Sequence, residues 1–185
     1  MKMQTLLILI GAGVALWGGW GVYISATTEE PPYKVLEQFE EKVEIRQYEE
    51  QTWISTRSGE RNAAFGVLAS YIFGQNEKQE SIAMTAPVIM DDNMSFILPE
   101  GYSEANVPAP DGQAMDFKTV PARKVATIRF SGWATARRVA DHTEKLMVVL
   151  EDNGVETDGE PFLMQYNPPM TLPMMRRNEV GIALP

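Results

Sequence analysis

The stretch RFSGWATARRVADHTEKLMVVLEDNG, which runs from Arg129 to Gly154, contains the clearest change of pattern in the chain. Strand-like residues end in RFSG, and a helical pattern follows in which one stripe of side chains recurs every three or four residues. The stripe consists of Val139, Thr143, Leu146 and Leu150. Thr135 is a good N-cap residue and Gly154 a good helix stop. The stretch therefore predicts a strand, a tight turn and a helix over 135–154.

A second stretch repeats this order earlier in the chain. TRSG (Thr56–Gly59) precedes RNAAFGVLASYIFG (Arg61–Gly74), whose apolar residues share one helical face. Asn62 and Gly74 are suited to begin and to end that helix. Two strand-like runs follow each helix, and the two halves close with the similar segments SFILP (95–99) and GIALP (181–185). The order strand, helix, strand, strand thus occurs twice.

The other β-branched and aromatic runs complete the expected sheet. They are residues 33–40, 43–57, 80–90, 93–99, 115–132 with a break at Pro121, 161–167 and 178–184. Pro87 must lie at a strand edge or a bulge, because it cannot donate a hydrogen bond. We predict an α+β fold, in which two pseudo-symmetric βαββ-type halves form a distorted antiparallel β-barrel that is flanked by two helices.

The N-terminus has a different composition. Residues Leu6–Ile24 carry no charge, and a helix of 19 residues at about 1.5 Å each just spans a hydrocarbon core of about 30 Å. Lys2 precedes this run, and Glu29 and Glu30 follow it. The positive-inside rule then places the rest of a single-pass chain outside the cytoplasm, facing the periplasm from the inner (cell) membrane.

These observations divide the chain into three parts. Residues 1–26 are interpreted as a signal-anchor or transmembrane helix, residues 27–32 as a tether and residues 33–185 as the folded domain. A cleaved signal peptide, which would release the domain into the periplasm, is the alternative for the first part.

Composition argues against several classes of function. The formal net charge of −9 disfavours nucleic-acid binding. The chain contains no cysteine, so disulfides and thiolate chemistry are excluded, and its single histidine, His142, cannot build a multi-histidine metal site. The sequence shows no nucleophile–base pair and no phosphate-binding glycine loop. We therefore expect a protein that is not an enzyme and has no metal site of its own.

Four segments, in the same order, carry a resemblance to a known family. They are YKVLEQFEEKVEIRQYEEQTWIST (33–56), IAMTAPV (82–88), VATIRFSGWAT (125–135) and YNPPMTLPMMRRNEV (166–180). Together they resemble the SOUL heme-binding family, and the resemblance extends from Tyr33 to the C-terminus. It implies a distorted β-barrel of two similar halves with two flanking helices. Taken together with the uncharged run Leu6–Ile24, it identifies the chain as a bacterial, N-terminally membrane-anchored member. Several members of that family bind heme or another tetrapyrrole.

The resemblance also implies a site, a shallow apolar cleft between the first helix and the loop before the last strand. The corresponding positions are Phe65, Leu68, Ala69 and Ile72 on the helix, and Met170, Leu172, Met174, Met175, Arg176 and Arg177 on the loop. Methionines can cover the face of a macrocycle, and arginines hold carboxylates such as heme propionates in charge-assisted bonds. The same loop residues also suit a plug at the barrel end, with one arginine in an internal salt bridge.

No residue is expected to be a strong ligand of the heme iron. His142 is predicted on the second helix, which does not belong to the implied cleft, between the charged residues Asp141 and Glu144. Met84 has a thioether but is expected to pack inside the sheet.

The sequence thus predicts non-enzymatic binding of heme or a related tetrapyrrole at the cell envelope, for scavenging, buffering or delivery. The alternative is a membrane-tethered protein-interaction module on the same fold that binds no cofactor. A third possibility is another amphipathic small molecule bound between the two halves. A concave apolar surface favours a small ligand, whereas a flat or convex one favours a protein partner.

Overall fold

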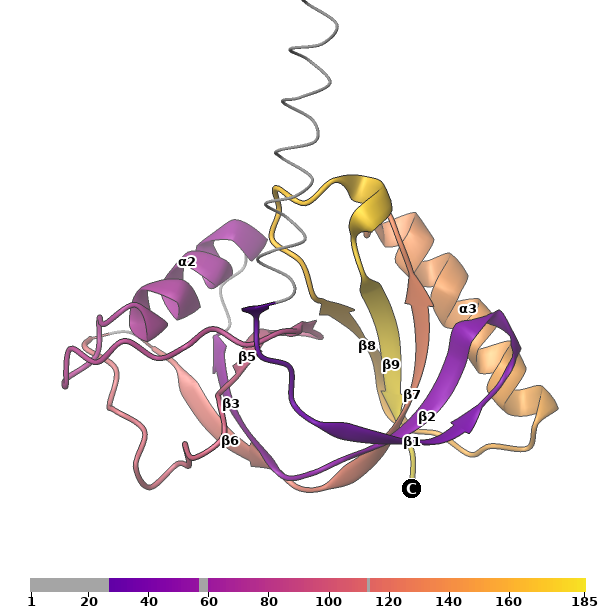
Figure 1. Ribbon diagram of the computed structural model, residues 1–185, viewed down its shortest axis with the longest axis horizontal. Helices are drawn as coiled ribbons and strands as arrows, with labels where there is room; N and C mark the ends of the chain where they lie inside the picture. Colours follow the sequence, from indigo (N-terminus) through magenta and orange to yellow (C-terminus); the bar gives the residue numbers. More distant parts are fainter. Residues whose placement is uncertain (1–26, 57–59, 113) are drawn as a thin grey trace, which may run out of the picture.

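Two helices and nine strands make up most of the computed structural model, which describes residues 27–56, 60–112 and 114–185 (Figure 1). The strands are β1 (Tyr33–Gln38), β2 (Val43–Tyr48), β3 (Gln51–Thr56), β4 (Val88–Met90), β5 (Met94–Ile97), β6 (Asp116–Val120), β7 (Arg123–Phe130), β8 (Asp158–Gln165) and β9 (Asn178–Ala183). The helices are α2 (Arg61–Ile72) and α3 (Ala136–Asp152), and two short 3₁₀ turns are η1 (Glu40–Lys42) and η2 (Pro173–Met175).

All nine strands pair antiparallel in one curved sheet of order β1-β2-β7-β9-β8-β4-β5-β3-β6. The sheet has two free edges, β1 and β6, so the distorted barrel is not closed. The predicted α+β class and the two flanking helices are confirmed. In the described part of the chain, no helix is long and apolar enough to cross a membrane, and the predicted span Leu6–Ile24 lies outside the described residues.

The sheet order shows the internal repeat directly. The unit β3-α2-β4-β5 has the same strand arrangement as β7-α3-β8-β9, and the two units meet where β4 pairs with β8. Each unit also takes its outer strand from the other half of the chain. β2 pairs with β7, and β6 pairs with β3. The chain therefore passes from one unit to the other at both short connections, β2–β3 and β6–β7.

This exchange corrects one prediction. The run 43–57 is not one strand, because it breaks at Glu49 and Glu50 into β2 and β3, which belong to different units. Both glutamates are exposed. Alternation of apolar and polar residues continues on both sides of the break, so the pattern alone gave no sign of it.

The predicted strand 80–90 is also shorter than expected. Only Val88–Met90 form β4, and the residues before Pro87 form a loop. Pro87 has no backbone N–H to continue a ladder. Instead, the Thr85 hydroxyl donates to the carbonyl oxygen of Ile97 at 2.5 Å, which satisfies a buried backbone group.

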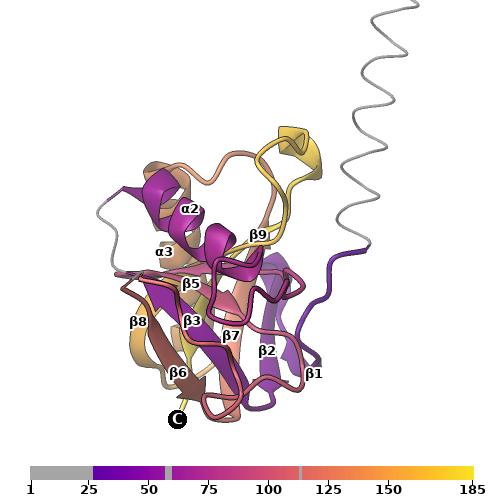
Figure 2. The same ribbon diagram turned by 90° about the vertical axis from the view of Figure 1, so that its left-hand side faces the viewer.

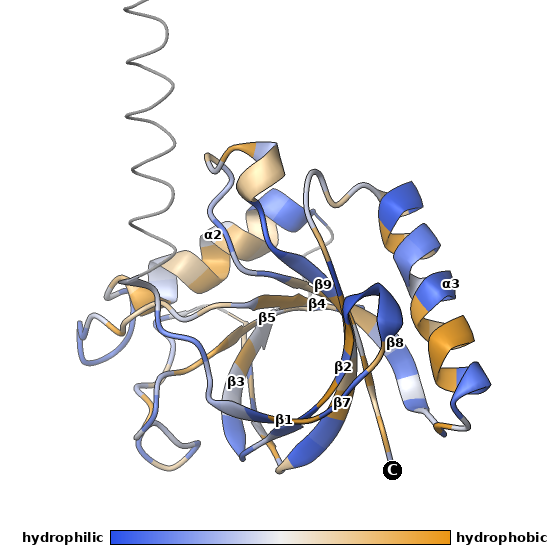
Figure 3. Ribbon diagram, turned by 45° about the vertical axis from the view of Figure 1, so that its right-hand side comes forward, coloured by the Kyte–Doolittle hydropathy of each residue, from blue (hydrophilic) through white to orange (hydrophobic). Residues whose placement is uncertain are grey.

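Both helices pack on one face of the sheet, each over its own unit. Leu146 and Leu150 pack α3 against β2, β7 and β9. Figure 3 shows hydrophilic and hydrophobic residues along α3, whereas α2 is hydrophobic along most of its length. Thr135 caps α3 as predicted, accepting a bond from the Arg138 N–H at 3.4 Å. For α2 the expected cap is wrong, because Glu60 rather than Asn62 precedes the first turn.

The packing of α3 yields a stability test with an internal control. Replacement of Leu146, which is fully buried, by alanine should lower the free energy of unfolding by about 2–5 kcal/mol, through lost burial and a new cavity. Replacement of its exposed neighbour Met147 by alanine should lower the free energy of unfolding by less than about 1 kcal/mol. Urea unfolding followed by tryptophan fluorescence compares the two variants. Equal losses would contradict the described orientation of α3.

Candidate functional site

An apolar cleft of about 400 Å³ opens between α2 and the segment that follows β8. Its lining residues come from both units and from the segment before β1: Thr28, Arg61, Asn62, Phe65, Met84, Thr85, Ala86, Val88, Met90, Met94, Gln165, Tyr166, Asn167, Pro168 and Pro169. Three methionines, one phenylalanine and one tyrosine make most of its side-chain surface suitable for an apolar ligand.

The cleft lies at the junction of the two units. Val88 of β4 pairs with Gln165 of β8 at this junction, and both residues line the cleft. The chain then leaves β8 through two consecutive prolines, Pro168 and Pro169, which cannot extend the ladder. The first turns of α2 form the opposite wall. The site therefore results from the pseudo-twofold arrangement, because neither unit alone supplies both walls.

The structure places the four predicted helix residues in two environments. Phe65 lines the cleft, and its ring meets Phe96 edge-on at 5.4 Å between centroids. Leu68 and Ile72 are 0% and 1% exposed and pack in the core beneath α2, and Ala69 is also buried. Leu68 and Ile72 thus support the helix from the sheet side, and none of the three residues lines the cleft.

The predicted loop residues lie beside the cleft rather than in its lining. Met170 and Met174 are 67% and 79% exposed, Met175 is also exposed, and Leu172 is half-buried. The same loop reaches the cleft through its beginning, Tyr166–Pro169.

Arg176 is engaged within the loop itself. Its Nε donates to the carbonyl oxygen of Thr171 at 2.8 Å, and Nη2 donates to that of Pro169. The guanidinium also lies 4.0 Å above the centre of the Trp133 ring. Partial burial lowers the pKa of Arg176 from its ordinary value. This arginine thus shapes the loop that forms one wall of the cleft.

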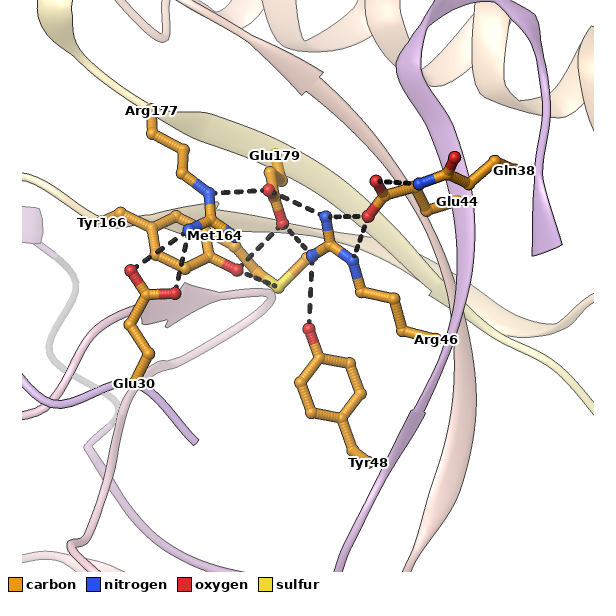
Figure 4. A network of polar contacts seen from close by, with 9 residues as sticks. All are labelled: Glu30, Gln38, Glu44, Arg46, Tyr48, Met164, Tyr166, Arg177 and Glu179. Carbon is orange, nitrogen blue, oxygen red and sulfur yellow. Dashed lines mark hydrogen bonds and ion pairs between the residues drawn. The ribbon is translucent and has the colours of Figure 1, made fainter. Parts of the chain in front are cut away.

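Arg177 belongs to a buried network of charges on the inner face of the sheet (Figure 4). Its Nε donates to Oε1 of Glu179 at 2.8 Å, and its guanidinium covers the ring of Tyr166 at 3.7 Å. From β2, Arg46 donates to both carboxylate oxygens of Glu179, at 2.6 and 3.2 Å. The Tyr166 hydroxyl adds a fourth bond, at 2.9 Å to Oε2. The fully buried carboxylate is therefore completely satisfied.

The network also fastens the segment before β1. Nη1 of Arg177 donates to both carboxylate oxygens of Glu30, at 3.1 and 2.9 Å. The backbone of the neighbouring Glu29 accepts a bond from the Ala86 N–H at 2.8 Å, and Thr28 lines the cleft. The segment that the sequence suggests is a tether, residues 27–32, thus lies against the rim of the cleft.

Electrostatics explain the ionisation of this network. Burial alone raises the pKa of Glu179, but hydrogen bonds and charge from Arg46 and Arg177 outweigh burial, and the pKa lies below its ordinary value. Burial raises the pKa of Tyr166 well above its ordinary value, and the Glu179 charge adds to this shift. Glu179 is therefore ionised and Tyr166 is a neutral donor at neutral pH.

The sequence analysis misplaced one cleft residue and missed others. Met84 was expected to pack inside the sheet, but it lies in the loop before β4, half-buried, and lines the cleft. Arg61 is exposed at the cleft, one turn before Phe65. Its position at the start of a predicted helix was the sequence feature that could have indicated an anion-binding residue. Met90 and Met94 pair across the β4–β5 hairpin. The strand pattern predicted both strands, but it did not show which face of the sheet would line the cleft.

His142 lies away from the cleft, on α3. Its ring stacks on Phe130 at 4.3 Å between centroids, and Nδ1 lies 2.6 Å from the carbonyl oxygen of Arg138. Within residues 27–56, 60–112 and 114–185, no three His, Cys, Asp or Glu side chains are grouped so that they could hold a metal ion.

Comparisons with known proteins agree with this architecture. The profile of the family described as SOUL heme-binding protein matches residues 28–183. Human heme-binding protein 2 is 31% identical over 162 residues, which cover 75% of this chain and 76% of that protein.

Solved structures show similarity in fold alone. The C-terminal domain of EcmrR superposes with a TM-score of 0.55 at 14% identity, covering 78% of this chain and 97% of that one. A hydrolase from Listeria innocua has a TM-score of 0.53 at 11% identity, covering 78% of this chain and 92% of that one.

The buried network yields a pH-dependent prediction. Glu179→Gln removes the charge that compensates Arg46 and Arg177, so it should lower the free energy of unfolding by about 3 kcal/mol at pH 7. Because the folded pKa of Glu179 is depressed, its contribution is complete above the unfolded value of about 4.3 and declines as the pH falls through the lower folded value.

Urea unfolding of both proteins between pH 7 and pH 3 measures this. We expect the difference between the two proteins to narrow below about pH 4. A difference that stays constant down to pH 3 would show that the charge of Glu179 is not what stabilises the fold.

Proposed function

The chain belongs to the SOUL heme-binding protein family, and we propose that it binds heme or a related tetrapyrrole in the cleft between α2 and Tyr166–Pro169. The observation that carries this proposal is the cleft itself, which is concave, mostly apolar and bounded by a cation. In the same proposal the chain acts by binding and catalyses no reaction.

The lining fits a tetrapyrrole in chemical character. Phe65, Met84 and Met90 offer apolar and polarisable surface for the faces of a flat macrocycle. The volume of about 400 Å³ is within the range of small-molecule sites, and the site is an open groove, so an edge of the macrocycle would stay in contact with solvent. Heme bound here would supply the redox and ligand chemistry of its iron, whereas the chain holds and shields the ring.

Arg61 is the best-placed residue for a propionate. It lines the cleft from the first turn of α2, where the positive end of the helix also favours an anion. Arg176 and Arg177 were expected in this role, but their guanidinium groups already bind loop carbonyls and the carboxylates of Glu30 and Glu179. Arg61 therefore takes the direct contact in our proposal, while the other two arginines hold the wall.

The iron would lack a histidine ligand. His142 lies on α3, away from the cleft, where it contacts the Arg138 carbonyl and stacks on the Phe130 ring. The soft donors among the described lining residues are the thioethers of Met84, Met90 and Met94. We propose that binding comes mainly from burial of the macrocycle and from Arg61 rather than from the iron.

We further propose that the protein acts at the cell envelope, in scavenging, buffering or delivery of the cofactor. The uncharged run Leu6–Ile24 supports an anchor, with the domain facing the periplasm or the outside. The second candidate, a tethered protein-interaction module without a cofactor, is supported by the exposed apolar loop residues Met170 and Met174. The concave cleft favours the ligand-binding function over this candidate.

A hemin titration of residues 27–185 tests the proposal. We expect saturable one-to-one binding with a Kd below about 1 μM, seen in the Soret band and in quenching of Trp53 or Trp133. Arg61→Ala should weaken binding about tenfold, because one charge-assisted hydrogen bond is lost. Met84→Leu, which keeps the volume, should leave the Soret position unchanged.

The controls separate specific binding from the general stickiness of hemin. Arg129→Ala removes an exposed arginine outside the cleft and should leave the affinity unchanged. Arg176→Ala tests the alternative propionate contact. Binding that does not saturate would contradict the proposed function. An equal loss of hemin affinity in the Arg61 and Arg129 variants would contradict the propionate role of Arg61, while the proposal that the cleft binds heme would stand.

A further inference from the structure

The loop next to the cleft presents an unusually apolar surface. Met170, Met174, Met175 and Trp133 are four of the nine large apolar side chains that are exposed among the described residues, and we call them the apolar knob. The Gly132 N–H donates to the carbonyl oxygen of Pro173 at 2.8 Å, and Arg176 stacks on Trp133 at 4.0 Å. Trp133 is therefore held beside η2, although it is far from it in sequence. Figures 1 and 2 both show η2 projecting beyond the ends of the strands.

Arginines lie near this knob on a protein of net charge −9. Arg137 and Arg138 lie in the first turn of α3, four and five residues after Trp133. Arg61 lies in the first turn of α2, across the cleft from the loop. Arg176 lies within the loop. The N-termini of both helices add the positive ends of their dipoles at this end of the domain. Four arginines thus lie on the elements next to the exposed methionines, and Glu60 precedes Arg61 at the start of α2.

Covalent geometry limits how far this end can lie from the anchor. Thr28 lines the cleft, and Glu29 and Glu30 are fixed to the domain by the Ala86 N–H and by Arg177. Only four residue steps separate Thr28 from Ile24, the end of the uncharged run. At most roughly 3.6 Å per residue, these steps span about 14 Å. If the run spans a bilayer, the cleft lies within that distance of its surface.

We infer that the apolar knob docks into the surface of an anionic phospholipid bilayer, so that the cleft opens at the membrane. Methionine and tryptophan side chains suit the interfacial region, and neighbouring arginines are attracted by anionic headgroups. The inference rests on the proposed function for the anchor and for an apolar ligand. It adds that the ligand enters from the lipid phase, where a flat apolar molecule with two carboxylates partitions.

Spin labelling tests the docking, because the chain has no cysteine and a single introduced cysteine is labelled uniquely. The full chain carries Met174→Cys or, as a matched control, Met147→Cys on the exposed side of α3. Each variant is reconstituted into vesicles of phosphatidylcholine with phosphatidylglycerol. Power-saturation EPR compares the access of oxygen with that of a water-soluble nickel chelate to the label.

The inference predicts that oxygen reaches the label at 174 severalfold better than nickel does, whereas the label at 147 behaves as in water. In vesicles of phosphatidylcholine alone, the label at 174 should become more accessible to nickel. Water-like accessibility of the label at both positions would overturn the membrane docking. The apolar knob would then be a contact surface for a protein partner. An unchanged depth in neutral vesicles would overturn the contribution of the arginines.

Two separate measurements distinguish failure of this inference from failure of the proposed function. Flotation of the labelled chain with its vesicles reports the anchor, and a chain that does not float overturns both the anchor and the docking. Hemin is absent from the EPR experiment, so its result does not depend on heme binding. Heme binding that fails in the titration, combined with a lipid-buried label at 174, would keep the docking and remove the heme.

Discussion

The structure depends on one buried carboxylate that is shared by two arginines. Glu179 lies on β9 with no exposure to solvent, and its charge is compensated by Arg46 from β2 and Arg177 from the preceding loop. Loss of one member of such a group would leave an uncompensated buried charge, which costs about 3–5 kcal/mol. The network therefore specifies how the last strand, the second strand and the loop before β9 must lie together.

The same network reaches the site. Tyr166 donates its hydroxyl to Glu179 and also lines the cleft, and Arg177 covers the Tyr166 ring while it holds Glu30. The cleft wall and the segment that leads to the N-terminus are thus fixed by one set of bonds. Binding at the cleft, in our account, needs this rigid wall more than it needs direct contact with the arginine pair.

The sequence predicted the fold class because helix stripes and turn residues are local signals, and Thr135 and Leu146 act as expected. The exchange of strands between units was not predictable, because alternation continues through the exposed break at Glu49 and Glu50. The candidate site was predictable in outline from family resemblance. Which residue faces the cleft depends on long-range pairing, so Phe65 lies in the lining while its helical neighbours face the core.

The central claim is that heme occupies the cleft at the junction of the two units. Carbon-13 labelling of the methionine methyl groups places 11 probes along the chain. Paramagnetic hemin should broaden the NMR signals of Met84, Met90 and Met94, which line the cleft, and leave that of Met147 on α3 sharp. Broadening that spares the three cleft methionines, or that affects all methionines equally, would contradict the account.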